Sequence, residues 1–326
     1  MQQSTPDPSP PPRPAAGRLS AAEVLSGLRM RPKRLSSTYL YDARGSHLFD
    51  RICALPEYYL TRTEMAILQT CCDAIARCIG DDALLVELGS GTSTKTRLLL
   101  DRLPRLAGYV PVDVSGSHLS AAARAIAASY PQLEVLPLHA DFTRPFVLPH
   151  PRRRPSRVVV FFPGSTIGNF DSPAAIALLQ LMRRIAGEGA GFVMGFDLQK
   201  DVATMERAYD DAEGVTAQFN LNVLVRLNRE LAADFDLQGF RHEAIWVPEA
   251  GRIEMRLVST RAQSVSIGGH DIAIAAGERI VTEHCHKYTL EGFAELAASA
   301  GWSLRARWMD EHRRFCVGYL EPAATG

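Results

Sequence analysis

A glycine turn and two acidic residues stand at the ends of short apolar runs, in an order that suits a nucleoside ligand. The stretch LLVELGSGTSTKT, residues 84–96, ends an apolar run and turns at Gly89 into a helix-like pattern. Asp113 closes the next apolar run, where a carboxylate can hold two ribose hydroxyls. Asp141 and Phe142 follow a third run, as an acceptor for an exocyclic amine beside a ring to stack on. This order predicts a nucleoside site at the carboxyl edge of a parallel sheet.

The glycine turn itself favours a ligand without phosphates. A dinucleotide-binding turn has three glycines as G-x-G-x-x-G, whereas here Gly89 and Gly91 are followed by Thr94 at the third position. The sequence also lacks the G-K-[ST] ending of a P-loop. A nucleoside with a charged aliphatic tail fits better, and S-adenosylmethionine is such a ligand. We expect Lys95 to reach its carboxylate, with an ordinary surface lysine as the alternative.

The segment VVVFFPGSTIGNF, residues 158–170, follows a further apolar strand. The loop after this fourth strand is where such an architecture places the transferred group and its acceptor. Asn169 offers two donors and an acceptor, which suits a carboxylate or an amine. Taken by itself, however, Asn169 is better explained as the left-handed residue of a turn.

Alternating strands and helices are expected to position these residues. Apolar runs predict strands at 84–88, 109–114, 133–138, 157–162 and 191–196, and runs such as VVVFF indicate strands buried on both faces of a parallel sheet. Thr61 and Glu64 are predicted to form a capping box that opens a preceding helix. Two helices and four short strands then break the rhythm over 197–282, which indicates an inserted α+β unit. A helix near 289–300 and two final strands complete the chain.

Composition limits the class of protein. Basic and acidic residues number 36 each, so the chain has no overall electrostatic bias toward nucleic acid or membranes, and the basic run PHPRRRPSR is expected to be a solvated loop. The six cysteines form no C-x-x-C pair, which favours reduced thiols in the cytoplasm over a metal site or disulfides. Residues 1–17 are proline-rich and predicted to be disordered, and no run approaches membrane-spanning length. We expect a cytoplasmic monomer without nucleic-acid or membrane partners.

Longer motifs resemble one known family. SSTYLYDARGSHLFDRICALPEYYLTRTE, VELGSGTSTKTRLLLD, FFPGSTIGNF, RIEMRL and TEHCHKYTLEGF are similar, in this order, to the histidine Nα-methyltransferases of ergothioneine biosynthesis. The resemblance implies an α/β fold: a Rossmann-like class I methyltransferase core at 61–196 and 287–321, and an α+β substrate-recognition domain made of 18–60 and the inserted 197–286. It also implies S-adenosylmethionine as cofactor and a small amino acid as substrate.

The resemblance assigns the site residues motif by motif. Cofactor contacts fall on Gly89, Lys95, Asp113, Asp141 and Phe142. Tyr41 and Tyr59 correspond to groups that hold the amine and the imidazole, and they are the candidate catalytic residues. The substrate-binding residues are Tyr59, Asn169, Tyr209, Met255, Glu283 and Cys285; of these, Asn169 and Tyr209 correspond to the carboxylate grip and Glu283 to the residue that reads the ring.

One position departs from the family, which has a serine bonded to the imidazole where this chain has Cys285. A thiol is a weaker hydrogen-bonding group than a hydroxyl. The predicted function is therefore Nα-methylation of L-histidine to trimethylhistidine (hercynine), with another acceptor such as tryptophan, tyrosine or a modified histidine as the alternative. A cofactor-binding protein without activity is a further alternative, which the retained Asn169, Tyr209 and Glu283 disfavour. The neighbouring His284 and His286 are expected to be structural.

Overall fold

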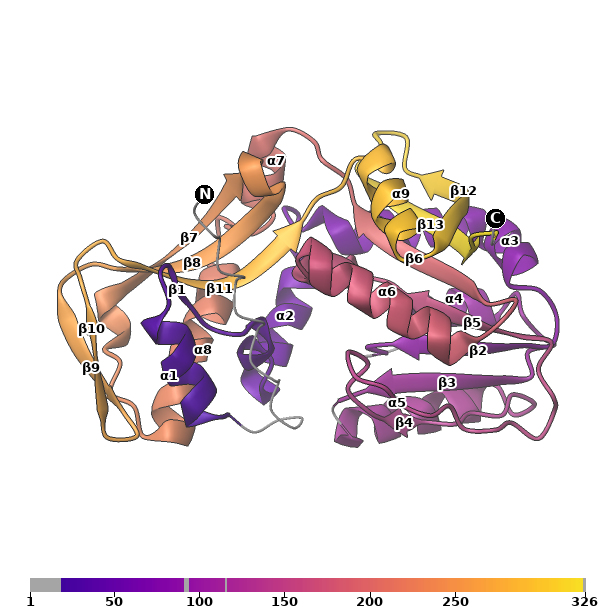
Figure 1. The fold of residues 1–326 in the computed structure, drawn as a ribbon, viewed down its shortest axis with the longest axis horizontal. Coiled ribbons are helices and arrows are strands. Elements are labelled where there is room, and N and C mark those ends of the chain that lie inside the picture. The colour runs from indigo at the N-terminus through magenta and orange to yellow at the C-terminus, as the bar shows by residue number, and fades with distance from the viewer. Residues whose placement is uncertain (1–18, 91–93, 115, 325–326) are drawn as a thin grey trace, which may run out of the picture.

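The structure is a computed structural model that describes residues 19–90, 94–114 and 116–324. The predicted disordered tail at 1–17 and Gly91 lie outside these residues. Figure 1 shows two sheets, a larger one on the right and a smaller one on the left with α1 (Ala21–Arg29) and α8 (Val215–Leu231) beside it.

The larger sheet has the order β12-β13-β6-β5-β2-β3-β4. Its strands are β2 (Ala83–Leu88), β3 (Gly108–Asp113), β4 (Leu138–His139), β5 (Arg157–Phe162), β6 (Gly191–Asp197), β12 (Trp302–Met309) and β13 (Phe315–Pro322). All pairs from β4 to β6 are parallel, whereas β13 runs antiparallel to both of its neighbours. The predicted Rossmann-like α/β core is confirmed, and the two predicted final strands form an antiparallel hairpin at its edge.

One strand differs from the sequence prediction. The run at 133–138 was expected to be a full strand, but β4 covers only Leu138–His139, with an isolated bridge from Val135 to Tyr109. Pro137 interrupts the run, and proline has no N–H to give to a strand ladder.

Helices cover both faces of the larger sheet. Successive strand residues point to opposite sides, and apolar side chains on both sides are buried by these helices. Leu85, Val159 and Phe161 belong to one buried cluster, and Leu84 and Val160 to another. α3 (Tyr59–Ile79) packs on β6 and β13, and α6 (Ser172–Ala186) packs on β5 and against α9 (Leu290–Ser299). α4 (Thr94–Leu100) and α5 (Gly116–Ser129) follow β2 and β3.

The smaller sheet has the order β1-β11-β8-β7. Its strands are β1 (Lys33–Arg34), β7 (Phe240–Val247), β8 (Arg252–Ser259) and β11 (Arg279–His286), with a separate hairpin of β9 (Gln263–Ile267) and β10 (His270–Ile274). The insertion also contains α7 (Val202–Arg207), α8, and the 3-10 turns η3 (Leu237–Gly239) and η4 (Pro248–Ala250). Residues before α3 join this unit, because β1 pairs with β11 and α2 (Ala43–Ala54) and η1 (Ser37–Leu40) pack on α8.

The two sheets share one hydrophobic core. A single buried cluster runs from Met255 and Cys285 of the smaller sheet, through Phe219 of α8 and Leu60 of α3, to Phe161 of the larger sheet. The predicted domain boundary at 60/61 falls within the first turn of α3. The assignment of the smaller unit to substrate recognition stays a prediction.

The predicted capping box at Thr61 and Glu64 is wrong. α3 begins at Tyr59, two residues earlier, and its cap residue, Tyr58, makes no side-chain capping bond. Glu64 is fully buried, and its carboxylate accepts from the N–H of Gly164 at 2.9 Å and from Nζ of Lys95 at 2.5 Å. The carboxylate lies against Gly195 of β6, where an added Cβ would come within 2.0 Å of it. Glu64 therefore ties α3 to the loop after β5.

We predict that Glu64→Ala destabilises the fold by about 2–4 kcal/mol, because it leaves a buried N–H and an ammonium without their acceptor. Thr61→Ala is the matched control and should change the free energy of unfolding by less than about 0.5 kcal/mol. Urea denaturation of the two variants measures both values. Equal losses in the two variants would instead support the capping box.

Candidate active site

The glycine turn after β2 has the geometry of a ligand cradle. Gly89 adopts a left-handed conformation with φ of 67°, and its N–H donates to the carbonyl of Val112 at 2.8 Å. An added Cβ at Gly89 would lie 3.8 Å from the ring of Phe142, so the turn and the ring are neighbours. Asp113 is the last residue of the adjacent strand β3 and is half-buried. A bare backbone turn, an aromatic ring and a strand-end carboxylate form a donor and acceptor set that fits a nucleoside.

The other predicted cofactor residues have protein partners. Oδ1 of Asp141 accepts from the N–H of Thr143 at 2.9 Å and from its hydroxyl at 2.6 Å, so this oxygen stabilises its own turn. The ring of Phe142 packs edge-to-face on Phe162, with centroids 5.5 Å apart. Lys95 is bound to Glu64 rather than extended toward solvent. The roles of Asp141 and Lys95 at a cofactor stay predictions.

The loop after β5 is held by hydrogen bonds to two neighbouring elements, α3 and β6. Glu64 of α3 binds the N–H of Gly164, and the hydroxyl of Ser165 accepts from the N–H of Asp197 in β6 at 2.9 Å. The left-handed residues are Gly164 (φ 84°) and Ser165 (φ 58°), whereas Asn169 ends the 3-10 turn η2 (Thr166–Asn169). The interpretation of Asn169 as the left-handed residue is therefore wrong. Its half-buried amide makes no hydrogen bond to the part of the chain that the structure describes.

Gly168 lets this loop contact the smaller sheet. A Cβ at Gly168 would lie 2.8 Å from the carbonyl oxygen of His286 and 3.3 Å from the sulfur of Cys285. The ring of His286 bonds in turn to the carbonyl of Gly168 through Nδ1, at 3.0 Å. His286 is thus a structural residue, as expected. The contact places the G-S-T-I-G-N loop directly beside the end of β11.

A buried polar network surrounds Asp197, the last residue of β6, whose side chain is fully buried. One of its oxygens accepts from the hydroxyl of Tyr59 at 2.6 Å and from Nζ of Lys287 at 2.9 Å. The other accepts from Nζ of Lys200 at 2.6 Å. Lys200 also donates to the hydroxyl of Tyr59 at 2.5 Å and lies 4.5 Å from the centre of its ring. Burial, together with the nearby Lys287, lowers the pKa of Lys200 to about 8 despite the attraction of Asp197.

Sequence reasoning did not assign a role to Asp197, Lys200 or Lys287. A signal was present, because Asp197 ends an apolar strand in the same way as Asp113. The alternation of Glu283, Cys285 and Lys287 along one face also pointed to Lys287, and all three side chains are buried.

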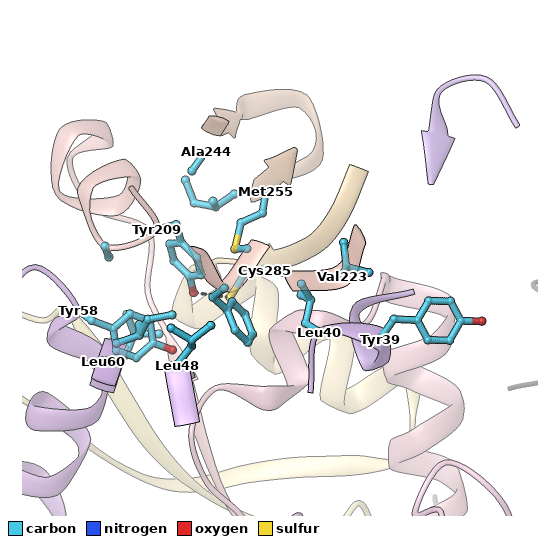
Figure 2. Close-up of a cluster of buried hydrophobic side chains, with 14 of the residues drawn as sticks. Tyr39, Leu40, Leu48, Tyr58, Leu60, Tyr209, Val223, Ala244, Met255 and Cys285 are labelled. Carbon is cyan, nitrogen blue, oxygen red and sulfur yellow. Dashed lines mark hydrogen bonds between the residues drawn. The ribbon is translucent and has the colours of Figure 1, made fainter. Parts of the chain in front are cut away.

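Tyr209, Cys285 and Lys287 form the second half of the network. The hydroxyl of Tyr209 donates to the sulfur of Cys285 at 2.8 Å and accepts from Nζ of Lys287 at 2.8 Å. Lys287 also donates to the sulfur, at 3.1 Å. Figure 2 shows the Tyr209 hydroxyl pointing at the sulfur of Cys285, with Met255 nearby on the strand beside β11. Tyr58 packs edge-to-face on the Tyr209 ring, with centroids 6.0 Å apart.

Glu283 pairs with Met255 across β11 and β8, and its carboxyl group is largely buried. Burial raises the pKa of Glu283 to about 7, although the positive charge of Lys287 and the hydroxyl of Tyr41 act in the opposite direction. Tyr41 is 38% exposed and packs edge-to-face on Phe219, with centroids 5.3 Å apart. Of the predicted substrate residues, Glu283, Met255, Cys285 and Tyr209 thus lie together.

Several other classes of site have no support in the described chain. Among residues 19–90, 94–114 and 116–324, no group of three His, Cys, Asp or Glu side chains is placed to hold a metal ion. All six cysteines are free thiols. In the same ranges, every helix falls short of the length and apolarity that crossing a bilayer requires.

Comparisons with known proteins show which family this chain resembles. The family model described as "Histidine-specific methyltransferase, SAM-dependent" matches residues 20–322. The chain is 44% identical over 302 residues to the histidine N-alpha-methyltransferase of Mycolicibacterium smegmatis, covering 89% of this chain and 92% of the relative. Identity is 42% over 295 residues to the protein of the same name from Mycobacterium tuberculosis, covering 89% and 90%. A part of the ergothioneine biosynthesis protein 1 of Neurospora crassa is 30% identical, covering 85% of this chain and 32% of that protein.

The cradle yields a prediction for Asp113. Asp113→Ala should weaken binding of S-adenosylhomocysteine by about 1–3 kcal/mol, because the ribose hydroxyls lose their acceptor. Isothermal titration calorimetry measures the change, and thermal unfolding shows whether the variant is folded. An unchanged dissociation constant in a folded variant would remove Asp113 from the ribose site.

Proposed function

The chain belongs to the family of histidine-specific, S-adenosylmethionine-dependent methyltransferases, and we propose that it methylates the α-amine of L-histidine. One observation carries the proposal. Gly168, in the loop after β5, contacts Cys285 of β11. The residues predicted to bind the amino acid therefore lie beside the carboxyl edge of the larger sheet, where the cofactor is predicted to bind. The names of the two mycobacterial relatives support the same reaction.

The amine is the nucleophile, and it must be unprotonated and in line with the methyl group. S-adenosylmethionine supplies an electrophilic methyl group on a sulfonium, whose leaving thioether is neutral, so positioning provides much of the rate. Tyr59 suits this task because its hydroxyl is fixed: it donates to Asp197 and accepts from Lys200. One lone pair of the oxygen remains for an N–H of the amine, which would orient the nitrogen lone pair.

Different side chains are proposed to bind the carboxylate and the ring of the substrate. Asn169 and Tyr209 are proposed to hold the α-carboxylate, since both can donate hydrogen bonds. Glu283 is proposed to accept from an imidazole N–H, with Met255 packed alongside it. A carboxylate that ionises near neutrality can accept from an imidazole N–H and can also pair with an imidazolium, whereas an indole or a phenol cannot take up such a positive charge.

We further propose up to three successive methylations, giving trimethylhistidine. A growing ammonium is stabilised by aromatic faces, and the buried cluster contains Tyr58 in addition to Tyr59 and Tyr209, whose rings already lie beside the ammonium groups of Lys200 and Lys287. The free thiols of the described chain support a cytoplasmic enzyme. We also propose that the protein acts as a monomer. The name of the Neurospora relative supports a role in ergothioneine biosynthesis.

The direct test is to incubate the purified protein with S-adenosylmethionine and each proteinogenic amino acid, and to read methylated products by mass. We expect histidine to gain one to three methyl groups. Methylation of tryptophan or tyrosine in place of histidine would show that Cys285 marks a changed specificity.

If Asn169 and Tyr209 bind the α-carboxylate, the enzyme should discriminate strongly against histamine, which lacks that group. L-Histidine should be methylated at least about 30-fold more efficiently, because a buried donor left without its acceptor costs roughly 1–3 kcal/mol and two donors are involved. Values of kcat/KM for the two compounds provide the measurement. Equal values would remove this role from Asn169 and Tyr209.

The pKa of Glu283, about 7, predicts how histidine recognition depends on pH. Because this pKa is raised above the usual range, the carboxyl group is neutral below pH 7 and becomes an acceptor as the pH rises through it. The KM for histidine should therefore fall between pH 6 and pH 8, by roughly ten-fold for one charge-assisted hydrogen bond. Glu283→Gln should lose this dependence while keeping the titration of the substrate itself.

Cys285→Ser is the matched control for Glu283→Gln, since it restores a better hydrogen-bonding group on the same strand face. We expect it to retain the pH dependence and to keep or raise histidine activity. A Glu283→Gln variant with the same profile as the native enzyme would place the ring pocket elsewhere.

A further inference from the structure

Lys287 occupies an unusual position for a lysine. Its side chain is completely buried, and its three N–H groups have three acceptors: a carboxylate oxygen of Asp197 at 2.9 Å, the hydroxyl of Tyr209 at 2.8 Å and the sulfur of Cys285 at 3.1 Å. Its main chain is fixed on both sides, because its N–H donates to Gly251 and its carbonyl accepts from Gln199. A fully bonded and immobile ammonium of this kind is costly to bury.

Neutralising Asp197 does not require Lys287. The other oxygen of Asp197 already binds the ammonium of Lys200 at 2.6 Å, and Tyr59 donates a further hydrogen bond. Two ammonium groups therefore share one buried carboxylate, which leaves this group of three side chains with an excess of positive charge. Burial alone would lower the pKa of Lys287, but Asp197 raises it above the ordinary value, so the second charge persists at neutral pH.

The hydrogen bond from Lys287 also determines the direction in which the hydroxyl of Tyr209 donates its own hydrogen bond. Because the phenol oxygen accepts from the ammonium, its own proton must point to another acceptor, which in this structure is the sulfur of Cys285. A phenol polarised by an ammonium is a stronger donor than a phenol alone. The best acceptor for such a donor, beside a buried ammonium, is an anionic oxygen.

We propose that Lys287 is a specificity-determining residue that selects an acceptor bearing a carboxylate, through the hydroxyl of Tyr209. The proposal rests on the proposed function, which places the α-carboxylate of the amino acid at Tyr209. Lys287 acts as a positioning residue behind Tyr209 and makes no direct contact with the substrate. It supplies the charge that Asn169 and Tyr209, both neutral groups, do not carry.

The test compares L-histidine with L-histidinamide, in which a neutral amide replaces the carboxylate. Dissociation constants are measured for both compounds by titration of the S-adenosylhomocysteine complex of the native protein and of Lys287→Met. We expect the native preference for histidine to fall by roughly ten-fold to hundred-fold in the variant, with little change for histidinamide. A merely structural role would weaken both compounds equally, and that result would overturn the proposal.

Two further variants keep the comparison decisive. Lys33→Met removes another buried lysine, whose Nζ donates to Leu28 in the smaller unit, and it should retain the native preference. If Lys287→Met does not bind S-adenosylhomocysteine, Lys287→Gln takes its place, because its amide can still donate to Tyr209 without the charge. A native preference in folded Lys287→Gln would likewise overturn the proposal. Native protein that neither binds nor methylates histidine would contradict the proposed function itself.

Discussion

The buried carboxylate of Asp197 holds together the elements from which the candidate site is built. It lies at the carboxyl end of β6, and it binds side chains from α3, from the segment after β6 and from the residue that follows β11. Its own N–H and carbonyl bind Ser165 and the N–H of Tyr288. An unpaired carboxylate at this depth would be prohibitively costly, so the charge of Asp197 depends on the partners that surround it. The position of Tyr59 follows from this constraint.

Close backbone approach is the second constraint. Gly168 and Gly195 have no room for a side chain, because the carbonyl of His286 and the carboxylate of Glu64 occupy the space where a Cβ would be. The loop after β5 is thereby clamped between α3 and β11. Clamping matters for methyl transfer, since the rate depends on holding two reactants in line rather than on strong acid or base chemistry.

Burial gives the polar groups of the site their chemical character. Glu283 and Lys200 have pKa values moved to about 7 and about 8, chiefly because their charged forms lose solvation. The same low dielectric strengthens each hydrogen bond of the network. A site with these properties can distinguish a substrate by its charge as well as by its shape, which is what selecting one amino acid requires.

The Rossmann-like core and the glycine turn could be predicted from the sequence alone, because continuous apolar runs, helix caps and glycine reflect local rules, whereas the pairing of the two final strands was expected only by analogy with the fold. The start of α6 is an example of such a local rule: Asp171 precedes the helix, and its side chain accepts from the N–H of Ala174. Resemblance of motifs identified the family and named Glu283 and Tyr209. Local rules failed where a distant partner competed. Glu64 was read as part of a cap, but it is turned inward by Gly164 and Lys95, and Asn169 was not the left-handed residue. Lys200 lies only three residues after Asp197, but Lys287 reaches this carboxylate through the tertiary fold alone, because an ion pair between residues about 90 positions apart depends on how two sheets meet and leaves no periodic trace in the chain.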